Sequence, residues 1–135
     1  MAGIYGPLNS RADFRRMLDR ALATAKKGLA RAPNSTVTQV AARQLEAMRK
    51  WTDNGRSPTE DEQRRVDIGV LAARELSDTG DPETEEWANQ LKLLYNFFQG
   101  WPTDQQAAAS TDADLLPLLE KIDNRRFQLG KRSGP

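Results

Sequence analysis

The sequence predicts an all-α protein: an antiparallel bundle of four main helices plus a shorter C-terminal helix on a linker. Apolar residues recur at three- and four-residue spacing in successive stretches, as they do on one face of a helix. N-cap and stop signals bound these stretches, and short turns such as 53–56 make consecutive helices run antiparallel. We expect the bundle over residues 1–102, a polar linker over 103–112, the C-terminal helix over 113–130 and a disordered tail over 131–135.

The first helix begins behind Ser10, a residue type that favours the N-cap position. Its apolar stripe runs from Phe14 to Leu29, and Pro33 with Asn34 ends it. At about 100° per residue, four basic residues fall within about 60° of each other, nearly opposite this stripe. These four residues are Arg16, Arg20, Lys27 and Arg31.

The second helix is predicted from about Thr36 to Thr52. Thr36 with Gln39 forms a capping-box pattern, and Ser35 is the competing cap. The Asp-Asn-Gly run at 53–55 is a stop signal, because Asn and Gly accept the left-handed conformation that closes a helix.

The third helix has the clearest start signal in the chain, Ser-Pro-Thr-Glu at 57–60. Ser57 caps the predicted helix and Glu60 completes the box. We expect one continuous helix that ends at Thr79-Gly80. Its apolar residues cover most of its circumference, which is typical of a central helix.

The fourth helix begins at Asp81-Pro82 and ends at Gly100. It and its exit hold five of the nine aromatic residues: Trp87, Tyr95, Phe97, Phe98 and Trp101. Adjacent Phe97 and Phe98 diverge by about 100°, so one stripe cannot bury both. Either the third helix covers one ring and the C-terminal helix the other, or the aromatic residues form an exposed patch for association.

These stripes predict the core of the bundle. We expect it to consist of Phe14, Leu18, Leu22, Ala25, Val40, Leu45, Met48, Val66, Val70, Ala73, Leu91 and Leu94. The C-terminal helix has an apolar face of its own that must be covered by something. We expect it to dock over Tyr95, Phe98 and Trp101, within one chain or between copies.

Charge is strongly segregated although the net charge is only +1. Residues 1–56 hold eleven Lys/Arg and four acids, 57–120 hold four bases and fourteen acids, and 121–135 hold five bases and one acid. Two interpretations follow. The basic and acidic parts attract each other within one fold, or they offer charged faces to a partner of opposite charge.

The residue inventory argues against an enzyme. The chain has no Cys and no His, so Ser–His and Cys–His catalysis and zinc-thiolate sites are excluded. No phosphate-binding loop or nucleotide signature occurs. The acidic clusters at 60–62 and 83–86 lie in first turns, where carboxylates stabilise the helix dipole. We therefore predict no catalytic residue, no cofactor and no metal site.

The remaining functions involve binding. We predict a protein–protein interaction module, either an adaptor, a regulator or an immunity- or antitoxin-like inhibitor, whose partner is another protein or a second copy of itself. The predicted partner-binding residues are Tyr95, Phe97, Phe98, Trp101, Arg16, Arg20, Lys27 and Arg31. The alternative, a nucleic-acid binder using the basic first helix, is disfavoured by the acidic middle of the chain.

The chain also indicates its compartment and origin. No apolar run approaches 18 residues, and the N-terminus lacks the regions of a signal peptide, so we expect a soluble cytoplasmic protein without membrane contact. Arg outnumbers Lys fourteen to six, which suits a bacterial genome of high GC content.

Overall fold

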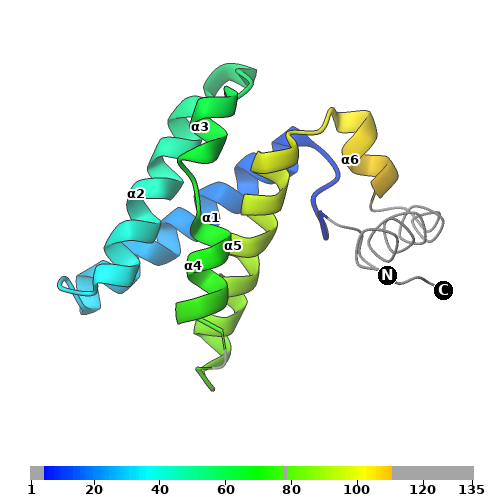
Figure 1. The fold of residues 1–135 in the computed structure, drawn as a ribbon. Helices are drawn as coiled ribbons and strands as arrows, with labels where there is room; N and C mark the ends of the chain where they lie inside the picture. The colour runs from blue at the N-terminus through cyan, green and yellow to red at the C-terminus, as the bar shows by residue number, and fades with distance from the viewer. Residues whose placement is uncertain (1–4, 78, 111–135) are drawn as a thin grey trace, which may run out of the picture.

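The computed structural model describes residues 5–77 and 79–110, and within these residues the regular structure is helical, with no β-strand. The prediction of an all-α fold is confirmed. Six α-helices and one short 3-10 turn follow each other along the described chain (Figure 1). They are α1 (Arg11–Arg31), α2 (Thr36–Trp51), the 3-10 turn (Asp53–Gly55), α3 (Glu60–Arg64), α4 (Ile68–Glu75), α5 (Pro82–Gly100) and α6 (Asp104–Ser110).

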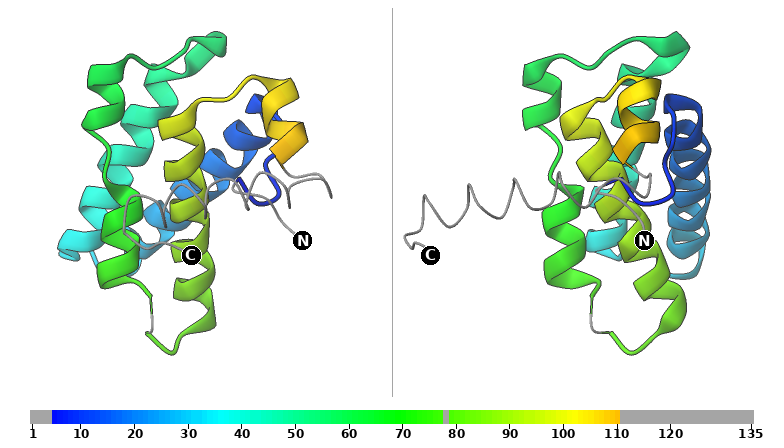
Figure 2. Two further views of the ribbon diagram at one scale, coloured as in Figure 1. Left: turned by 45° about the vertical axis from the view of Figure 1, so that its right-hand side comes forward. Right: turned by 90° about the vertical axis from the view of Figure 1, so that its right-hand side faces the viewer.

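Four of the helices close a ring around the core. α1 packs against α2, α2 against α4, α4 against α5, and α5 against α1 (Figure 2). α3 and α6 extend from the same end of this ring (Figure 1). α2 and α5, the two main neighbours of α1, leave its outer face uncovered.

Side-chain hydrogen bonds cap the N-termini of α1 and α2. The cap of α1 is the predicted one, and the cap of α2 decides between Ser35 and Thr36. Ser10 Oγ accepts a hydrogen bond from Asp13 N at 3.1 Å, and Ser35 Oγ accepts one from Thr38 N at 3.3 Å. Ser35, not Thr36, is therefore the N-cap of α2. Such a cap satisfies a backbone N–H that has no partner within the helix.

Ion pairs join the antiparallel hairpin of α1 and α2. Arg15 pairs with Asp53 at 2.8 Å and Arg49 with Asp19 at 2.9 Å, while Lys26 and Glu46 lie 4.0 Å apart. Both Asn54 (φ 55°) and Gly55 (φ 77°) adopt the left-handed conformation that the stop signal predicts. Exposed pairs of this kind contribute little individually, about 0–1 kcal/mol each.

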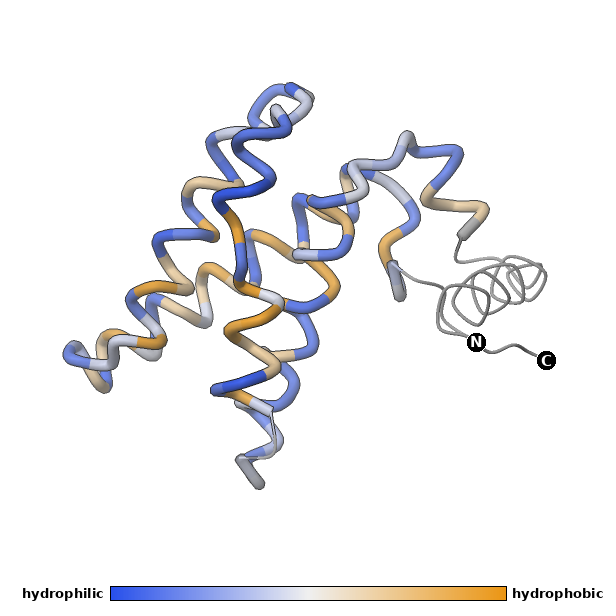
Figure 3. The backbone as a smooth tube through the Cα atoms, viewed as in Figure 1, coloured by the Kyte–Doolittle hydropathy of each residue, from blue (hydrophilic) through white to orange (hydrophobic). Residues whose placement is uncertain are grey.

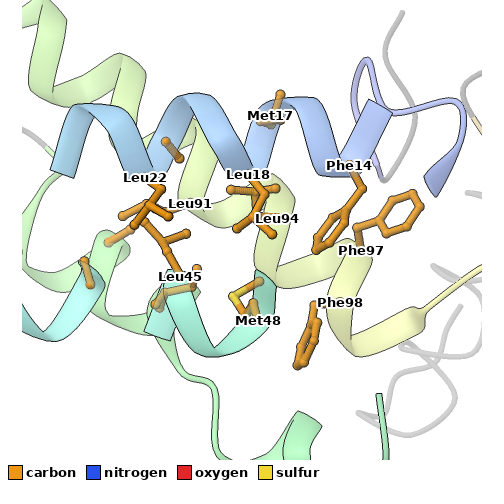
Figure 4. Packing of buried hydrophobic residues seen from close by; sticks show 14 of the residues in the cluster. Phe14, Met17, Leu18, Leu22, Leu45, Met48, Leu91, Leu94, Phe97 and Phe98 are labelled. Carbon is orange, nitrogen blue, oxygen red and sulfur yellow. The ribbon is translucent and has the colours of Figure 1, made fainter. Parts of the chain in front are cut away.

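The core lies between α1, α2 and α5, where large side chains interdigitate (Figure 4). Most of the largest fully buried residues come from these three helices, and α4 adds Ile68. They are Phe14, Leu18, Leu45, Met48, Leu91, Leu94, Phe97 and Phe98. Hydropathy along the backbone follows the same division, with polar residues on the outward turns (Figure 3).

The prediction of one continuous third helix is wrong. The chain forms α3, breaks at 65–67 and restarts as α4. The cap is also different from the one predicted, because Thr59 pairs with Glu62 in a capping box, whereas Ser57 binds the indole of Trp101. Of the two parts, α3 has no buried residue, whereas α4 packs against α5 and α2.

Glutamine side chains from α2 and α5 form hydrogen bonds with backbone groups at this break. Gln44 Oε1 accepts from Asp67 N at 2.8 Å, and Gln99 Nε2 donates to Gln63 O at 2.6 Å. Gln63 Nε2 in turn donates to Phe98 O at 2.9 Å. Backbone groups freed at the break thus obtain partners, which is the condition for a break beside the core.

Three of the predicted core residues are not buried. Two of them lie on α4, where the break changes which residues face inward, and the third lies on α2. α4 turns Ile68, Gly69 and Ala72 into the core. Val70 is therefore 46% exposed and Ala73 is exposed too, while Val40 on α2 is only half-buried. The other nine predicted core residues are buried.

The predicted polar linker is helical over Asp104–Ser110. Thr103 Oγ1 accepts from Gln106 N at 3.1 Å, and Ala107 is fully buried. An alanine- and glutamine-rich segment has high helix propensity, which the absence of an apolar stripe concealed. The predicted C-terminal helix (113–130), its docking and the predicted tail (131–135) lie outside the described residues.

We predict that two apolar truncations destabilise the fold to very different extents. Leu18→Ala should lower the free energy of unfolding by roughly 2–4 kcal/mol, because Leu18 is 0% exposed and its removal leaves a cavity. Val70→Ala should cost under about 0.5 kcal/mol, because Val70 lies on the surface. Urea denaturation measures both. Equal losses would mean that the break between α3 and α4 is misplaced.

Candidate protein-interaction surface

The two adjacent phenylalanines of α5 are both in the core, so the prediction of an exposed aromatic patch is wrong for them. Phe97 stacks on Phe14 of α1 with ring centroids 5.1 Å apart, and Phe98 stacks on Trp51 of α2 at 6.4 Å. Both phenylalanines are 0% exposed. Burial of both rings was the other alternative, but α1 and α2 are among the elements that cover them, which sequence periodicity did not indicate.

Tyr95 is half-buried and is used mainly for helix packing. Its ring lies against Gly69 of α4 so closely that a Cβ atom added to Gly69 would lie 2.5 Å from Tyr95 Cδ2. The absence of a side chain at Gly69 therefore lets α4 approach α5. Because Tyr95 is half-buried, only part of its side chain is accessible to a partner.

Trp101 is half-exposed and is held in an unusual conformation. It ends α5 in the left-handed region (φ 34°, ψ 63°), which is uncommon for a residue other than glycine. Its indole Nε1 donates to Ser57 Oγ at 3.1 Å, and the guanidinium of Arg11 lies 4.7 Å from the ring centroid. The ring also meets Phe14 edge-on at 5.4 Å.

A hollow of about 330 Å³ opens beside this ring, and we call it the Trp101 hollow. It lies where the start of α1, the turn after α2 and the end of α5 meet. Its lining consists of Arg11, Ala12, Phe14, Arg15, Thr52, Asn54, Gly55 and Trp101. Trp101 was predicted as a partner-binding residue, whereas Arg11 and Arg15 were not, because they are far from Trp101 in the chain.

The four basic residues predicted on one face of α1 are all exposed, and we call them the basic stripe: Arg16, Arg20, Lys27 and Arg31. Arg16 pairs with Asp13, whereas Arg20 and Lys27 make no ion pair within residues 5–77 and 79–110. The structure therefore brings the stripe together, but separately from Tyr95.

Acidic residues at the start of α5 lie beside the far end of the basic stripe. A second hollow, of about 280 Å³, is lined on one side by Lys27 and Arg31 and on the other by Asp81, Glu83 and Glu86. Hydrogen bonds from Thr84, and more weakly the charge of Arg31, lower the pKa of Asp81 below its ordinary value. Opposite charges thus meet within the fold here.

The pKa shifts of Glu62 and Tyr5 also have structural causes. The hydrogen-bonded Arg56 guanidinium lowers the pKa of Glu62, and burial raises the pKa of Tyr5. In the part of the chain that the structure describes, no cluster of metal-ligating side chains occurs. Across the same residues, no helix is long and apolar enough to cross a membrane.

The described helices form an all-α ring with a cationic face and an aromatic-lined hollow. The model of the Tsi6 family matches residues 14–125, which is most of the chain, so the chain belongs to the Tsi6 family. This family indicates an immunity-type protein of type VI secretion that binds a partner protein. Comparisons with curated proteins and with solved structures give no match.

The contact of Tyr95 with Gly69 predicts opposite effects for two glycine substitutions. Gly69→Ala should lower the free energy of unfolding by roughly 1–3 kcal/mol, because the new methyl group would clash with the ring. Gly28→Ala on α1 meets only Thr38 Cγ2 at 3.4 Å and should stabilise by up to about 1 kcal/mol through helix propensity. Thermal unfolding of both variants tests this, and a harmless Gly69→Ala would contradict the close approach.

The cap of α5 predicts how one carboxyl group titrates. Because its folded pKa is depressed, Asp81 stabilises the fold above its ordinary pKa and loses that contribution as pH falls through the folded value. Carbon-detected NMR should show the pKa of Asp81 below the ordinary aspartate value. Thr84→Val should raise this pKa again, and an unchanged pKa in that variant would contradict the assigned cause.

Proposed function

We propose that this chain is an immunity protein that inhibits a type VI secretion toxin by binding it in the cytoplasm, without catalysis of its own. The observation that carries the proposal is the family match, which spans α1 to α6 and continues beyond residue 110. The exposed basic stripe and the partly exposed Trp101 supply surface for such a complex.

Among the described residues, the two carboxyl groups with lowered pKa values belong to helix caps and not to one shared site. Catalytic groups usually have shifted pKa values and gather in one cleft. Here the lowered pKa values of Glu62 and Asp81 arise at two separate helix caps, where they stabilise the fold. Neither residue lines the Trp101 hollow.

The basic stripe favours an acidic partner surface. The two acids of α1 are already paired, Asp13 with Arg16 and Asp19 with Arg49, so they do not neutralise Arg20 or Lys27. α1 is 21 residues long, or about 30 Å, which matches the width of a standard protein interface. Complementary charge speeds association and excludes wrong partners.

A growth assay tests the proposal. The chain is purified from its host, the protein bound to it is identified, and that protein is expressed alone. We expect it to arrest growth and the co-expressed chain to restore growth. A bound protein that does not harm cells, or a chain that does not rescue them, would contradict the proposal.

Charge reversal tests the surface. Arg20→Glu combined with Lys27→Glu should weaken binding to the identified protein by about tenfold or more in low salt, because rim charges govern association. Arg74→Glu, an exposed change on α4, is the control and should leave the affinity unchanged. Salt-sensitive binding of the unchanged chain to duplex DNA would instead support the nucleic-acid alternative. Light scattering of the purified chain tests the predicted homodimer.

A further inference from the structure

We propose that the Trp101 hollow is an anchor pocket for the partner, and that it takes an apolar side chain flanked by a carboxylate. The inference rests on the proposed function, since it adds to the basic stripe a second contact with the same protein. It places the energetically dominant contact at the end of the ring where α1 begins and α5 ends.

The shape and lining of the hollow suit an apolar side chain. The aromatic residues Phe14 and Trp101 line it together with Ala12 and Gly55, which have little or no side chain. Gly55 adopts φ 77°, and a Cβ atom there would meet nothing within 4 Å, so this rim is open. Aromatic-lined hollows of a few hundred Å³ accept single anchoring residues in many interfaces.

The charge of the hollow suits a carboxylate beside that side chain. Arg11 and Arg15 line it, and no Asp or Glu does. Arg11 is oriented by hydrogen bonds from Nε to Pro102 O (2.9 Å) and from Nη2 to Trp101 O (3.4 Å), and Arg15 by bonds to Arg49 O and Asp53. Among the described residues, Arg11 Nη1 and Arg15 Nε have no hydrogen-bond partner, so each can donate to a carboxylate.

The indole ring is fixed before a partner arrives. The left-handed backbone of Trp101 is held by its N–H bond to Phe97 O at 2.6 Å, and its ring by Ser57 and Arg11. A non-glycine residue in this region stores strain that the surrounding contacts must offset. A ring that is already ordered loses little entropy on binding, which is a property of interface hot spots.

The hollow between α1 and α5 does not compete for this role. Its lining mixes cations with carboxylates, Lys27 and Arg31 with Asp81, Glu83 and Glu86, so it has no single sign of charge to offer a partner. Only the Trp101 hollow combines aromatic lining with charge of one sign among the hollows described above.

A peptide titration of the full chain tests the pocket. The probe is acetyl-Asp-Phe-Asp-amide, followed through the indole N–H signal of Trp101 by NMR, with Trp101→Phe to assign that signal. We expect this signal to shift at millimolar peptide while those of Trp51 and Trp87 stay in place. Peptides with Asn for both Asp residues, or Ala for Phe, should bind roughly tenfold more weakly.

A variant that fills the Trp101 hollow provides the second test of the pocket. Ala12→Phe places a ring in the hollow from an exposed helix position and should abolish the peptide-induced shift. Ala23→Phe, also exposed on α1 but outside the hollow, is the matched control and should bind the peptide normally. Thermal unfolding confirms that both variants fold.

The outcomes separate this inference from the proposed function. No shift of the Trp101 signal, equal binding of the Asn or Ala peptides, or normal binding by Ala12→Phe would overturn the anchor pocket. Growth rescue by the unchanged chain would in that case leave the proposed function standing. If the chain does not restore growth but the Trp101 signal shifts with the peptide, the proposed function is overturned. The hollow would then still be a pocket for acidic peptides, with a different partner.

Discussion

Phe97 and Phe98 are neighbours on α5, and neither has any exposed surface. Their rings point about 100° apart, so two different elements must cover them. Phe14 of α1 stacks on one and Trp51 of α2 on the other. This double contact fixes the end of α5 across the hairpin of α1 and α2, and the remaining elements are placed around it. α4 packs on the free side of α5, where Gly69 admits the ring of Tyr95.

The same constraint builds the proposed binding surface. Once the phenylalanines are fixed, the chain must turn sharply at Trp101, whose left-handed conformation directs the indole towards Arg11 and Ser57. The hollow beside it is thus a consequence of core packing. The basic stripe is independent of this cluster, because it lies on the face of α1 opposite the core. A partner that spans both surfaces would contact one rigid helix over much of its length.

Much of the fold could be predicted from local signals. Ser10 and Asp81 cap α1 and α5 as expected, and the period of the apolar residues identified the inner faces of α1 and α5. The break between α3 and α4 could not be predicted, because its stabilising groups, Gln44 and Gln99, come from distant parts of the chain. The basic stripe could be predicted from helical spacing, because all its residues lie on one helix. The Trp101 hollow could not, because its lining comes from three separate chain segments.

We propose that this protein binds a toxin through the outer face of α1 and the Trp101 hollow. Hydrogen–deuterium exchange of the chain, free and bound to the protein it neutralises, tests this claim most directly. We predict that binding slows exchange in α1, in the turn at 53–57 and around Trp101, and leaves α4 unchanged. Protection confined to α3 and α4, with α1 and Trp101 unaffected, would contradict the account.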